Sequence, residues 1–535
     1  MRPNKDRQNL WLWAALLLPL LWLAAGLAQI TEQAHGLSAL AAGLTALLND
    51  PLNLRWCSST PKFLLAVLVL YPLGVYCYLL DQADRRPGEE HGSAHWGNAK
   101  ELNERYRNRK DPRQEIILSQ NIRISNDSYQ HQRNLHVVVI GGSGSGKTRF
   151  FVKPNALQCS GSYFFLDPKG ELTYSLGGAM EENGVTVTVI DFVHFRGHYN
   201  PVAYLKTDED AMKLAYALVF NTKKNPAASG GENEFWDKSA VMFLASLILY
   251  ILYESPLYER NLNTMMDMIL ECKVSEDSYD ENRMDILFGE LEQRDPHHPA
   301  VLQYRSFKLG SAKTLSSIMV TAVSNLHMLQ SAAFAEMIAS DEMFLPKLGV
   351  EKRAIFCVIP DNDDTFNFMV SILYTQLFDQ LFRLADSTPE FHGTLPVHVR
   401  LMMDEFANVA TPENFVKILA VARSRNISCD IILQNISQIK SKYKDDWETI
   451  IGNCDSLVYL GGNDYSTFEY ISKLLGKQTI RTKGQSIGKG SHGSSSDSYQ
   501  VTGRELMTPD EVRRMKRSDC LVMISGEAPV RDKKY

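Results

Sequence analysis

The sequence predicts an α/β fold in which a parallel sheet is interrupted by a helical insertion and preceded by two transmembrane helices. Short apolar, β-branched runs alternate with helical stretches over residues 135–191, which is the pattern of βαβ units. The strand signal is weak from about 201 to 345, where helical periodicity dominates, and it resumes at 353. Two uncharged apolar runs, residues 10–30 and 63–80, come before any globular pattern. The chain is therefore expected to divide into a membrane part and a sheet-based part.

Composition sets broad limits on the protein. At 535 residues the chain is long enough for two or three domains. Its formal net charge of -6 gives no global signature of a nucleic-acid binder, although a ring or channel protein can gather basic residues on one surface. The cysteines form no C-x-x-C pair and most lie in apolar runs, so we expect reduced core residues rather than a disulfide or zinc framework.

The two apolar runs predict a membrane anchor over residues 1–82, because each is of a length that spans a bilayer. Basic residues lie outside both runs, at Arg2, Lys5, Arg7, Arg85 and Arg86. Because lysine and arginine favour the cytoplasmic side, the N-terminus and the C-terminal bulk are expected there, with residues 31–62 as a short exposed loop. The prediction is a multi-pass membrane protein with its large part in the cytoplasm.

Two other interpretations of these runs stay open. Gly26-Leu27-Ala28 resembles the small-residue cleavage site of a signal peptide. The run 63–80 contains Pro72 and is short enough for a buried core helix. The tandem arrangement of the runs favours the membrane anchor.

The rest of the chain divides into four predicted segments. Residues 83–133 are polar and charged and form a linker and the start of the sheet domain, with room for short edge strands. Residues 134–203 and 346–535 form the two parts of that domain, and residues 204–345 form an all-α insertion domain. Strands are predicted at 135–140, 162–166, 185–191, 353–360, 397–404, 429–433, 456–460 and 520–525.

Two stretches within these segments need separate comment. The apolar run 241–253 of the insertion is too short to predict a third membrane span. Residues 483–498 are rich in glycine and serine, which predicts a flexible loop.

A phosphate-binding motif follows the first predicted strand. The spacing G-x-x-x-x-G-K-[ST] begins at Gly141 and is completed by Gly146, Lys147 and Thr148. Glycines let backbone N–H groups curl around a polyphosphate, Lys147 reaches the β and γ phosphates, and the Thr148 hydroxyl binds Mg²⁺. The predicted ATP-binding residues are Gly141, Gly142, Ser143, Gly144, Ser145, Gly146, Lys147 and Thr148.

A second motif supplies the acids that ATP hydrolysis needs. The run VRLMMDE, residues 399–405, has the form of a Walker B strand, in which apolar residues end in two acids. Asp404 is expected to hold Mg²⁺ opposite Thr148, and Glu405 to orient and deprotonate the attacking water. The combination of both motifs predicts an ATPase.

Two further groups fit phosphoryl transfer. Gln434 follows the predicted strand 429–433, where it would sense the γ-phosphate or position water. Arg423 and Arg425 lie on the connection before that strand. An arginine that neutralises transition-state charge in a neighbouring subunit's site is a common device, and this role for Arg423 requires a ring of subunits. A surface arginine is the alternative for both.

The ordered set of motifs resembles the type IV secretion coupling proteins of the VirD/TraG branch, the membrane-anchored DNA-translocating ATPases of bacterial conjugation. The resemblance rests on the two N-terminal runs and on these motifs: GGSGSGKT at 141–148, DPKGEL at 167–172, YNP at 199–201, FWDKSA at 235–240, MDEFAN at 403–408 and ARSRNIS at 422–428, with Gln434 after it.

The resemblance implies a RecA-like motor that forms a homo-hexamer in the bacterial cell membrane. Its implied partners are single-stranded DNA with its relaxase, or relaxosome, and the channel components of the type IV secretion system. Residue by residue it supports Lys147 and Thr148 for nucleotide and magnesium, and Asp404 and Glu405 for hydrolysis. It also supports Arg423 as a finger in trans and Gln434 as a sensor.

The expected function is recruitment of a relaxase–DNA complex and ATP-driven pumping of single-stranded DNA into the secretion channel. The chain lacks the long C-terminal extension with which some members recruit relaxase, so substrate choice is expected to fall to the helical domain or an adaptor. Lys308 and Lys313 are candidate phosphate contacts. The alternatives are a substrate-recruiting gate for effector proteins and an FtsK-like pump of double-stranded DNA.

Overall fold

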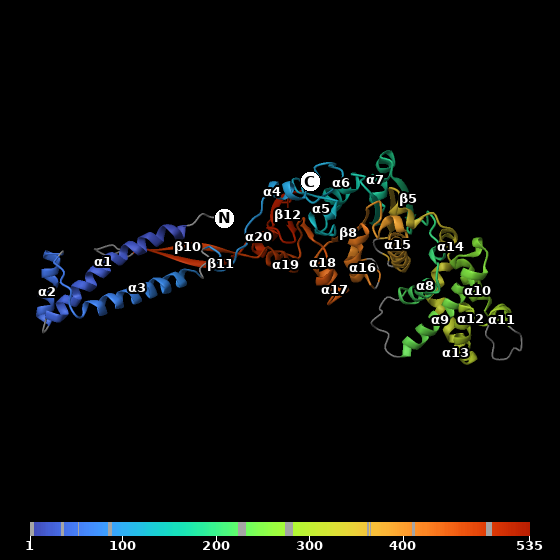
Figure 1. Ribbon diagram of the computed structural model, residues 1–535. Helices are drawn as coiled ribbons and strands as arrows, with labels where there is room; N and C mark the ends of the chain where they lie inside the picture. Colours follow the sequence, from blue (N-terminus) through green and yellow to red (C-terminus); the bar gives the residue numbers. More distant parts are fainter. Residues whose placement is uncertain are drawn as a thin grey trace. The chain divides into compact units, whose positions relative to one another are not determined.

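The computed structural model describes residues 5–33, 37–51, 53–83, 88–168, 170–222, 232–272, 282–360, 363, 365–408, 412, 414–487 and 495–535. The chain separates into two compact units (Figure 1). The smaller unit joins Met1–Ser93 to Gln478–Gly503, and the larger unit joins Ala94–Lys477 to Arg504–Tyr535.

A nine-stranded sheet organises the described part of the larger unit, in the order β13-β12-β9-β3-β8-β7-β4-β6-β5. The seven strands from β9 to β5 are parallel, whereas β12 and β13 add an antiparallel edge. The strands are β3 (Val137–Ile140), β4 (Ser162–Pro168), β5 (Thr186–Asp191), β6 (Arg353–Ile359), β7 (Val399–Met403), β8 (Ile427–Leu433), β9 (Ser456–Tyr459), β12 (Asp519–Ile524) and β13 (Val530–Lys533). All eight predicted strands are confirmed, and β13 was not predicted.

The central strands are apolar on both faces because both faces are covered. Val138 and Ile140 of β3 belong to one hydrophobic core, whereas Val137 and Val139 belong to the other. Such continuous apolar strands are typical of a parallel sheet buried on two sides. Since parallel strands end at the same edge, the residues that follow β3, β8, β7 and β4 are brought together there.

Helices of 4 to 21 residues accompany this sheet and the segment before it. The helices are α4 (Ala99–Tyr106), α5 (Ser128–His131), α6 (Lys153–Ala156), α7 (Glu171–Glu182), α15 (Asn367–Ser387), α16 (Phe415–Ala422), α17 (Ile436–Tyr443), α18 (Trp447–Gly452), α19 (Tyr465–Leu475) and α20 (Pro509–Arg513). The predicted edge strands before the P-loop are confirmed as β1 (Glu115–Ile117) and β2 (Arg123–Ser125), a separate antiparallel pair. Ile116 and Ile124 are buried, so this segment is part of the core rather than only a linker.

A helical segment lies between β5 and β6 in the chain, as predicted. It consists of α8 (Asp208–Phe220), α9 (Glu232–Glu254), α10 (Leu262–Glu271), α11 (Arg283–Arg294), α12 (Pro299–Lys308), α13 (Ala312–Leu326) and α14 (Ala332–Ala339). These helices belong to the same compact unit as the sheet, so the domain boundaries 204 and 345 stay a prediction.

Helix α9 is the hydrophobic centre of that segment. The helix extends beyond the predicted run 241–253, and the stretch Phe235–Glu254 is long and apolar enough to cross a membrane. However, 72% of this stretch is buried inside the protein, and Phe243, Leu247 and Ile251 are fully covered. Burial therefore makes α9 a core helix.

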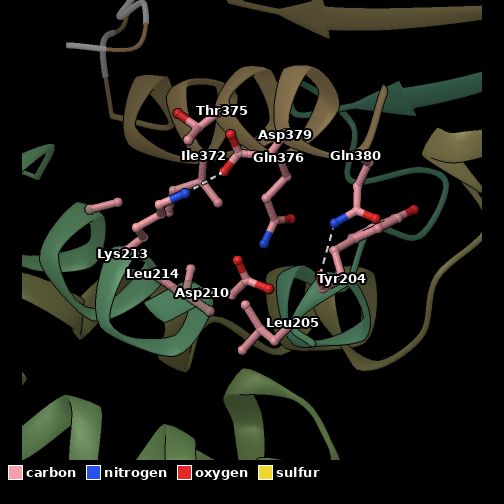
Figure 2. Close-up of a pocket in the computed structure, with 11 residues that line it drawn as sticks. Tyr204, Leu205, Asp210, Lys213, Leu214, Ile372, Thr375, Gln376, Asp379 and Gln380 are labelled. Carbon is pink, nitrogen blue, oxygen red and sulfur yellow. Dashed lines mark hydrogen bonds and ion pairs between the residues drawn. The ribbon is translucent and has the colours of Figure 1, made fainter. Parts of the chain in front are cut away.

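The tyrosine of the YNP motif ties the helical segment to α15. The Tyr199 hydroxyl donates to Gln376 Oε1 at 2.6 Å, and Gln376 Nε2 donates to the Pro201 carbonyl at 2.8 Å. Figure 2 shows α15 lying against α8 and this segment, with Lys213 paired to Asp379 across the gap. The cavity between them has about 30 Å³, room for only one or two waters.

The smaller unit contains α1 (Lys5–Gln33), α2 (Leu37–Asn49), α3 (Thr60–Ala83) and nearly all of a hairpin of β10 (Lys477–Ile487) and β11 (Ser495–Glu505). Trp13–Glu32 and Thr60–Tyr78 are long and apolar enough to cross a membrane, and only 22% and 6% of them are buried. Their exposed apolar surface is suited to lipid rather than water, which supports membrane anchoring.

Two predictions for this unit were wrong. The expected loop 31–62 contains helix α2, because the Leu- and Ala-rich stretch 37–49 packs against α1, where Gly43 lies beside Ile30. The expected flexible loop 483–498 is largely a β-hairpin, because backbone N–H and C=O groups of any residue except proline can pair across two strands. Residues 488–494 of that stretch lie outside the described residues.

Candidate nucleotide site

The P-loop begins at the end of β3 and is held by its neighbouring strands. The Gly141 N–H donates to the Leu433 carbonyl at 3.0 Å, and the Gly142 N–H donates to the Gly461 carbonyl at 2.9 Å. Gly144 and Gly146 have φ angles of +71° and +87°, which L-residues other than glycine rarely adopt. These two positions let successive N–H groups turn toward one centre, the arrangement that binds phosphate.

Two buried polar groups of the loop fit a polyphosphate. Lys147 is buried, and its Nζ donates to the Gly141 carbonyl at 3.0 Å, so the ammonium lies across the loop. The Ser145 hydroxyl is buried and has no hydrogen-bond partner among the described residues. A bound phosphate would supply acceptors for both groups, because its oxygens are strong acceptors. Thr148 follows directly and starts the helical segment Thr148–Val152.

The Walker B acids follow β7 at the same edge. Glu405 has a φ of +54°, and its N–H donates to Asp404 Oδ1 at 3.0 Å. Burial raises the pKa of Asp404 to about 6, the charges of Glu405 and Asp167 add to the rise, and Lys147 opposes it. A carboxylate and a hydroxyl are hard oxygen ligands, so Asp404 and Thr148 are chemically suited to hold Mg²⁺ with a nucleotide.

Gln434 is hydrogen-bonded to Glu405. It follows β8, the strand next to β7, and its Nε2 donates to the two carboxylate oxygens of Glu405 at 2.7 Å and 2.9 Å. The amide therefore fixes the orientation of the carboxylate. The predicted residues Lys147, Thr148, Asp404, Glu405 and Gln434 thus come from three adjacent strand ends of one sheet.

Arg423 does not lie at this edge. It belongs to the turn Arg423–Arg425 before β8, which places it at the amino end of the parallel strands, opposite the P-loop. It is exposed and borders a cleft of about 490 Å³ that Tyr129 and Lys352 also line. Arg425, by contrast, is paired with Asp386 at 2.8 Å and lies over the Phe382 ring at 4.8 Å.

Asp167 is a residue of the site that the sequence did not assign. It lies near the carboxyl end of β4 and accepts hydrogen bonds from the Leu172 and Thr173 N–H groups at 3.0 Å and 2.7 Å, which hold the start of α7. Burial raises the pKa of Asp167, and its charge in turn raises that of Asp404. Asp167 belongs to the motif DPKGEL, which was recognised in the sequence but was not assigned a function.

Lys534 also contacts the P-loop, although it belongs to no motif that was recognised in the sequence. Its Nζ donates to the Ser145 carbonyl at 2.9 Å and lies 5.6 Å from the centre of the Phe150 ring.

The two candidate DNA contacts, Lys308 and Lys313, lie in the helical segment, away from the P-loop in the sequence. Lys308 pairs with Asp285 at 2.8 Å, which neutralises part of its charge, and Lys313 is exposed.

Comparison with known proteins identifies the family. The family model for type IV secretory system conjugative DNA transfer matches residues 89–535. The conjugal transfer protein TraG of Rhizobium radiobacter is 23% identical over 413 residues, which cover 74% of this chain and 61% of TraG. TraG of Escherichia coli is 25% identical over 413 residues, covering 72% and 62%. Protein VirD4 of Rhizobium radiobacter is 23% identical over 411 residues, covering 75% and 56%. The chain therefore matches about three fifths of the length of these relatives.

Solved structures agree on the fold. The bacterial conjugative coupling protein TrwBdeltaN70 in its unbound monoclinic form gives a TM-score of 0.59 at 16% identity, covering 84% of this chain and 95% of that one. The plasmid coupling protein TrwB in complex with ADP and Mg²⁺ gives a TM-score of 0.56 at 16% identity, covering 84% and 96%. The expected P-loop ATPase fold is confirmed. With a family model that spans most of its length, this chain belongs to the type IV secretion coupling proteins of conjugative DNA transfer.

Proposed function

We propose that this chain is a membrane-anchored ATPase that recruits a relaxase–DNA complex and pumps single-stranded DNA into a type IV secretion channel during conjugation. The observation that carries the proposal is the Glu405–Gln434 pair beside a complete P-loop, in a chain of the conjugative DNA transfer family. A carboxylate held in one orientation at the edge where phosphates bind is suited to activate water.

The nucleotide roles are supported by the residues and by the fold neighbour. Lys147 and the loop N–H groups would hold the phosphates, while Thr148 and Asp404 would hold Mg²⁺. TrwB has been crystallised with ADP and Mg²⁺ and with the non-hydrolysable analogue ADPNP. When bound, the metal supplies positive charge against the charge that develops on the transferred phosphoryl group.

The position of Arg423 supports a ring of subunits, as in the proposed hexamer. Arg423 lies at the amino end of the strands, opposite the P-loop at their carboxyl ends. It therefore cannot complete its own site without rearrangement, whereas its exposure leaves it accessible to the site of a neighbouring subunit. The cleft beside it, with Tyr129 and Lys352, would form the facing surface.

The membrane part supports placement in the bacterial cell membrane. Both Trp13–Glu32 and Thr60–Tyr78 expose apolar surface along most of their length. In the proposed topology both helices cross the membrane, and the sheet with its ATP site lies in the cytoplasm, where ATP and the DNA substrate are available.

The decisive experiment measures ATP hydrolysis by the full chain in detergent, with and without single-stranded DNA. We expect DNA to raise the rate and Lys147→Ala to abolish it. Mixing Arg423→Ala with Lys147→Ala subunits, each inactive alone, should restore part of the rate, because a site with an intact Lys147 can then take Arg423 from a neighbour. Arg425→Ala is the matched control, since Arg425 is engaged with Asp386 in its own chain.

Other outcomes would reassign the function. If relaxase or another protein stimulates hydrolysis and DNA does not, the chain is a recruiting gate for effector proteins. Stimulation by duplex DNA alone would favour an FtsK-like pump. No recovery of hydrolysis in the mixture of Arg423→Ala and Lys147→Ala would remove the in-trans role.

A further inference from the structure

We propose that Lys534 is a positioning residue for the P-loop, which keeps the Ser145–Gly146 peptide oriented for nucleotide binding. The inference rests on the proposed binding of ATP at this loop. Lys534 donates from Nζ to the Ser145 carbonyl at 2.9 Å, a contact between residues 389 positions apart in the chain.

The backbone of Lys534 is fixed by hydrogen bonding at the edge of the sheet. The residue directly follows β13, and its backbone N–H donates to the Ser518 carbonyl at 2.9 Å. Strand β13 pairs with β12, β12 with β9, and β9 with β3, the strand from which the P-loop emerges. The base of Lys534 and the base of the P-loop therefore belong to one hydrogen-bonded framework.

The contact determines which way a loop N–H group points. A trans peptide is planar, so its carbonyl and its N–H point in opposite directions. Because Lys534 binds the Ser145 carbonyl, the N–H of Gly146 is directed away from Lys534. A glycine with φ of +87° has no Cβ to oppose rotation of the preceding peptide, so an outside hydrogen bond is needed to select one orientation.

The side chain also covers the ring that packs on the loop. A Cβ placed on Gly146 would lie 2.3 Å from Cδ2 of Phe150, which shows how closely this ring lies against the loop. The ammonium of Lys534 lies 5.6 Å from the centre of that ring, and the side chain is half-buried. Lys534 thus fixes the loop directly through Ser145 and indirectly through Phe150.

The preceding residue, Lys533, supplies a matched control. Its Nζ donates to Asp519 at 2.6 Å and to Ser518 at 3.2 Å, so its charge is engaged at the edge of the sheet. Replacing Lys533 removes the same charge from the same strand end without removing the hydrogen bond to Ser145.

The test uses the full chain in detergent, with a fluorescent ATP analogue for binding and ATP hydrolysis for KM and kcat. Removal of one charged hydrogen bond predicts that Lys534→Met raises Kd and KM by roughly 5- to 10-fold, with kcat within about 2-fold of wild type. Lys534→Arg keeps a donor and should recover most of the affinity, whereas Lys533→Met should bind like wild type. Lys534→Gln is the second variant if Lys534→Met does not fold.

Three outcomes overturn the inference. Unchanged affinity in Lys534→Met, or in Lys534→Gln where that variant is used, shows that the contact does not position the loop. Equal loss in Lys533→Met shows an effect of charge at the strand end instead. A wild-type chain that binds no more analogue than Lys147→Ala removes the proposed function itself, and the role of Lys534 with it.

Discussion

At the scale of single residues, the hydrogen bond from Gln434 to Glu405 makes the clearest prediction about catalysis. Glu405→Gln keeps the shape of the side chain but removes the base, so kcat should fall by about 10²- to 10⁴-fold. Gln434→Ala leaves the base but frees its orientation, so kcat should fall less, by roughly 10- to 100-fold. Steady-state hydrolysis measures both, and nucleotide affinity should stay near that of wild type. A double variant, Glu405→Gln with Gln434→Ala, whose loss equals the product of the two single losses would show that Gln434 acts on the phosphate rather than through Glu405.

The raised pKa of Asp404 predicts that the free energy of unfolding depends on pH when no nucleotide or metal is bound. Burial raises this pKa from 3.8 to about 6, so the folded chain retains a proton that the unfolded chain loses. The resulting stabilisation is complete below about pH 4 and is lost as the pH rises through 6. Asp404→Asn removes this loss and should raise Tm at pH 7.5 by roughly 1–3 °C, with no gain at pH 4.

Thermal unfolding of both proteins across pH 4 to 8 checks this expectation. The same variant should lose hydrolysis, because the amide is a poor Mg²⁺ ligand. A gain in Tm that is equal at all pH values would contradict the assignment to this carboxyl.

How well the site could be predicted differs from residue to residue. Lys147, Asp404, Glu405 and Gln434 were predicted because each follows a strand whose apolar pattern is local, and parallel strands gather their ends. Lys534 could not be predicted, since its contact with Ser145 joins residues far apart in the chain and depends on the antiparallel edge β12–β13.

At the scale of elements, a buried ion pair joins β7 to β8 beneath the site. Arg400 Nε donates to Asp430 Oδ2 at 2.6 Å, and Arg400 Nη1 donates to Asn155 Oδ1 at 2.9 Å. Arg400 and Asp430 are both buried, and burial raises the pKa of Asp430 while Arg400 opposes the rise. Removal of one partner leaves an uncompensated buried charge, so the two strands depend on the pair.

This pair makes a prediction about stability. Arg400→Met should lower the free energy of unfolding by about 3–5 kcal/mol, and the double change Arg400→Met with Asp430→Leu should recover most of the loss. Arg425→Met is the control, because its partner Asp386 is exposed to solvent, so loss of this pair should cost about 1 kcal/mol or less. Urea unfolding of the chain in detergent measures all three. A double variant as unstable as Arg400→Met would show that packing, not charge, sets the cost.

Elements were predicted where their pattern is local and missed where it is not. The eight predicted strands carry apolar runs of their own, whereas β13, with Arg531 and Asp532, has a polar sequence and is set by pairing with β12. Residues 483–498 of the hairpin at 477–505 were predicted to form a loop because glycine and serine dominate its tip, although its arms pair with each other. Helix α9 was predicted to belong to a helical segment rather than to span the membrane, and its burial supports that prediction although the helix is longer than the predicted run.

At the scale of the whole molecule, the proposed topology places the segment between α1 and α3 on the side of the membrane opposite the cytoplasm. Cys57 lies in this segment and is partly exposed, whereas Cys77 lies within the apolar stretch Thr60–Tyr78. Desolvation and the neighbouring Glu32 raise the pKa of the Cys57 thiol. Thiols react as thiolates, so labelling is best performed above neutral pH.

The topology predicts that a membrane-impermeant maleimide labels the chain in intact spheroplasts and that Cys57→Ser abolishes the label. Ser340→Cys in the Cys57→Ser background supplies the control, because Ser340 is exposed in the unit with the P-loop and should react only after permeabilisation. The physical basis is that two spans return the chain to the side on which it began, so the labelled loop and the ATP site lie on opposite sides. Labelling of Cys57 only after permeabilisation would mean that α1 and α3 do not both cross the membrane in this direction. The proposed placement of the ATP site and of its DNA substrate on the cytoplasmic side would then have to be revised.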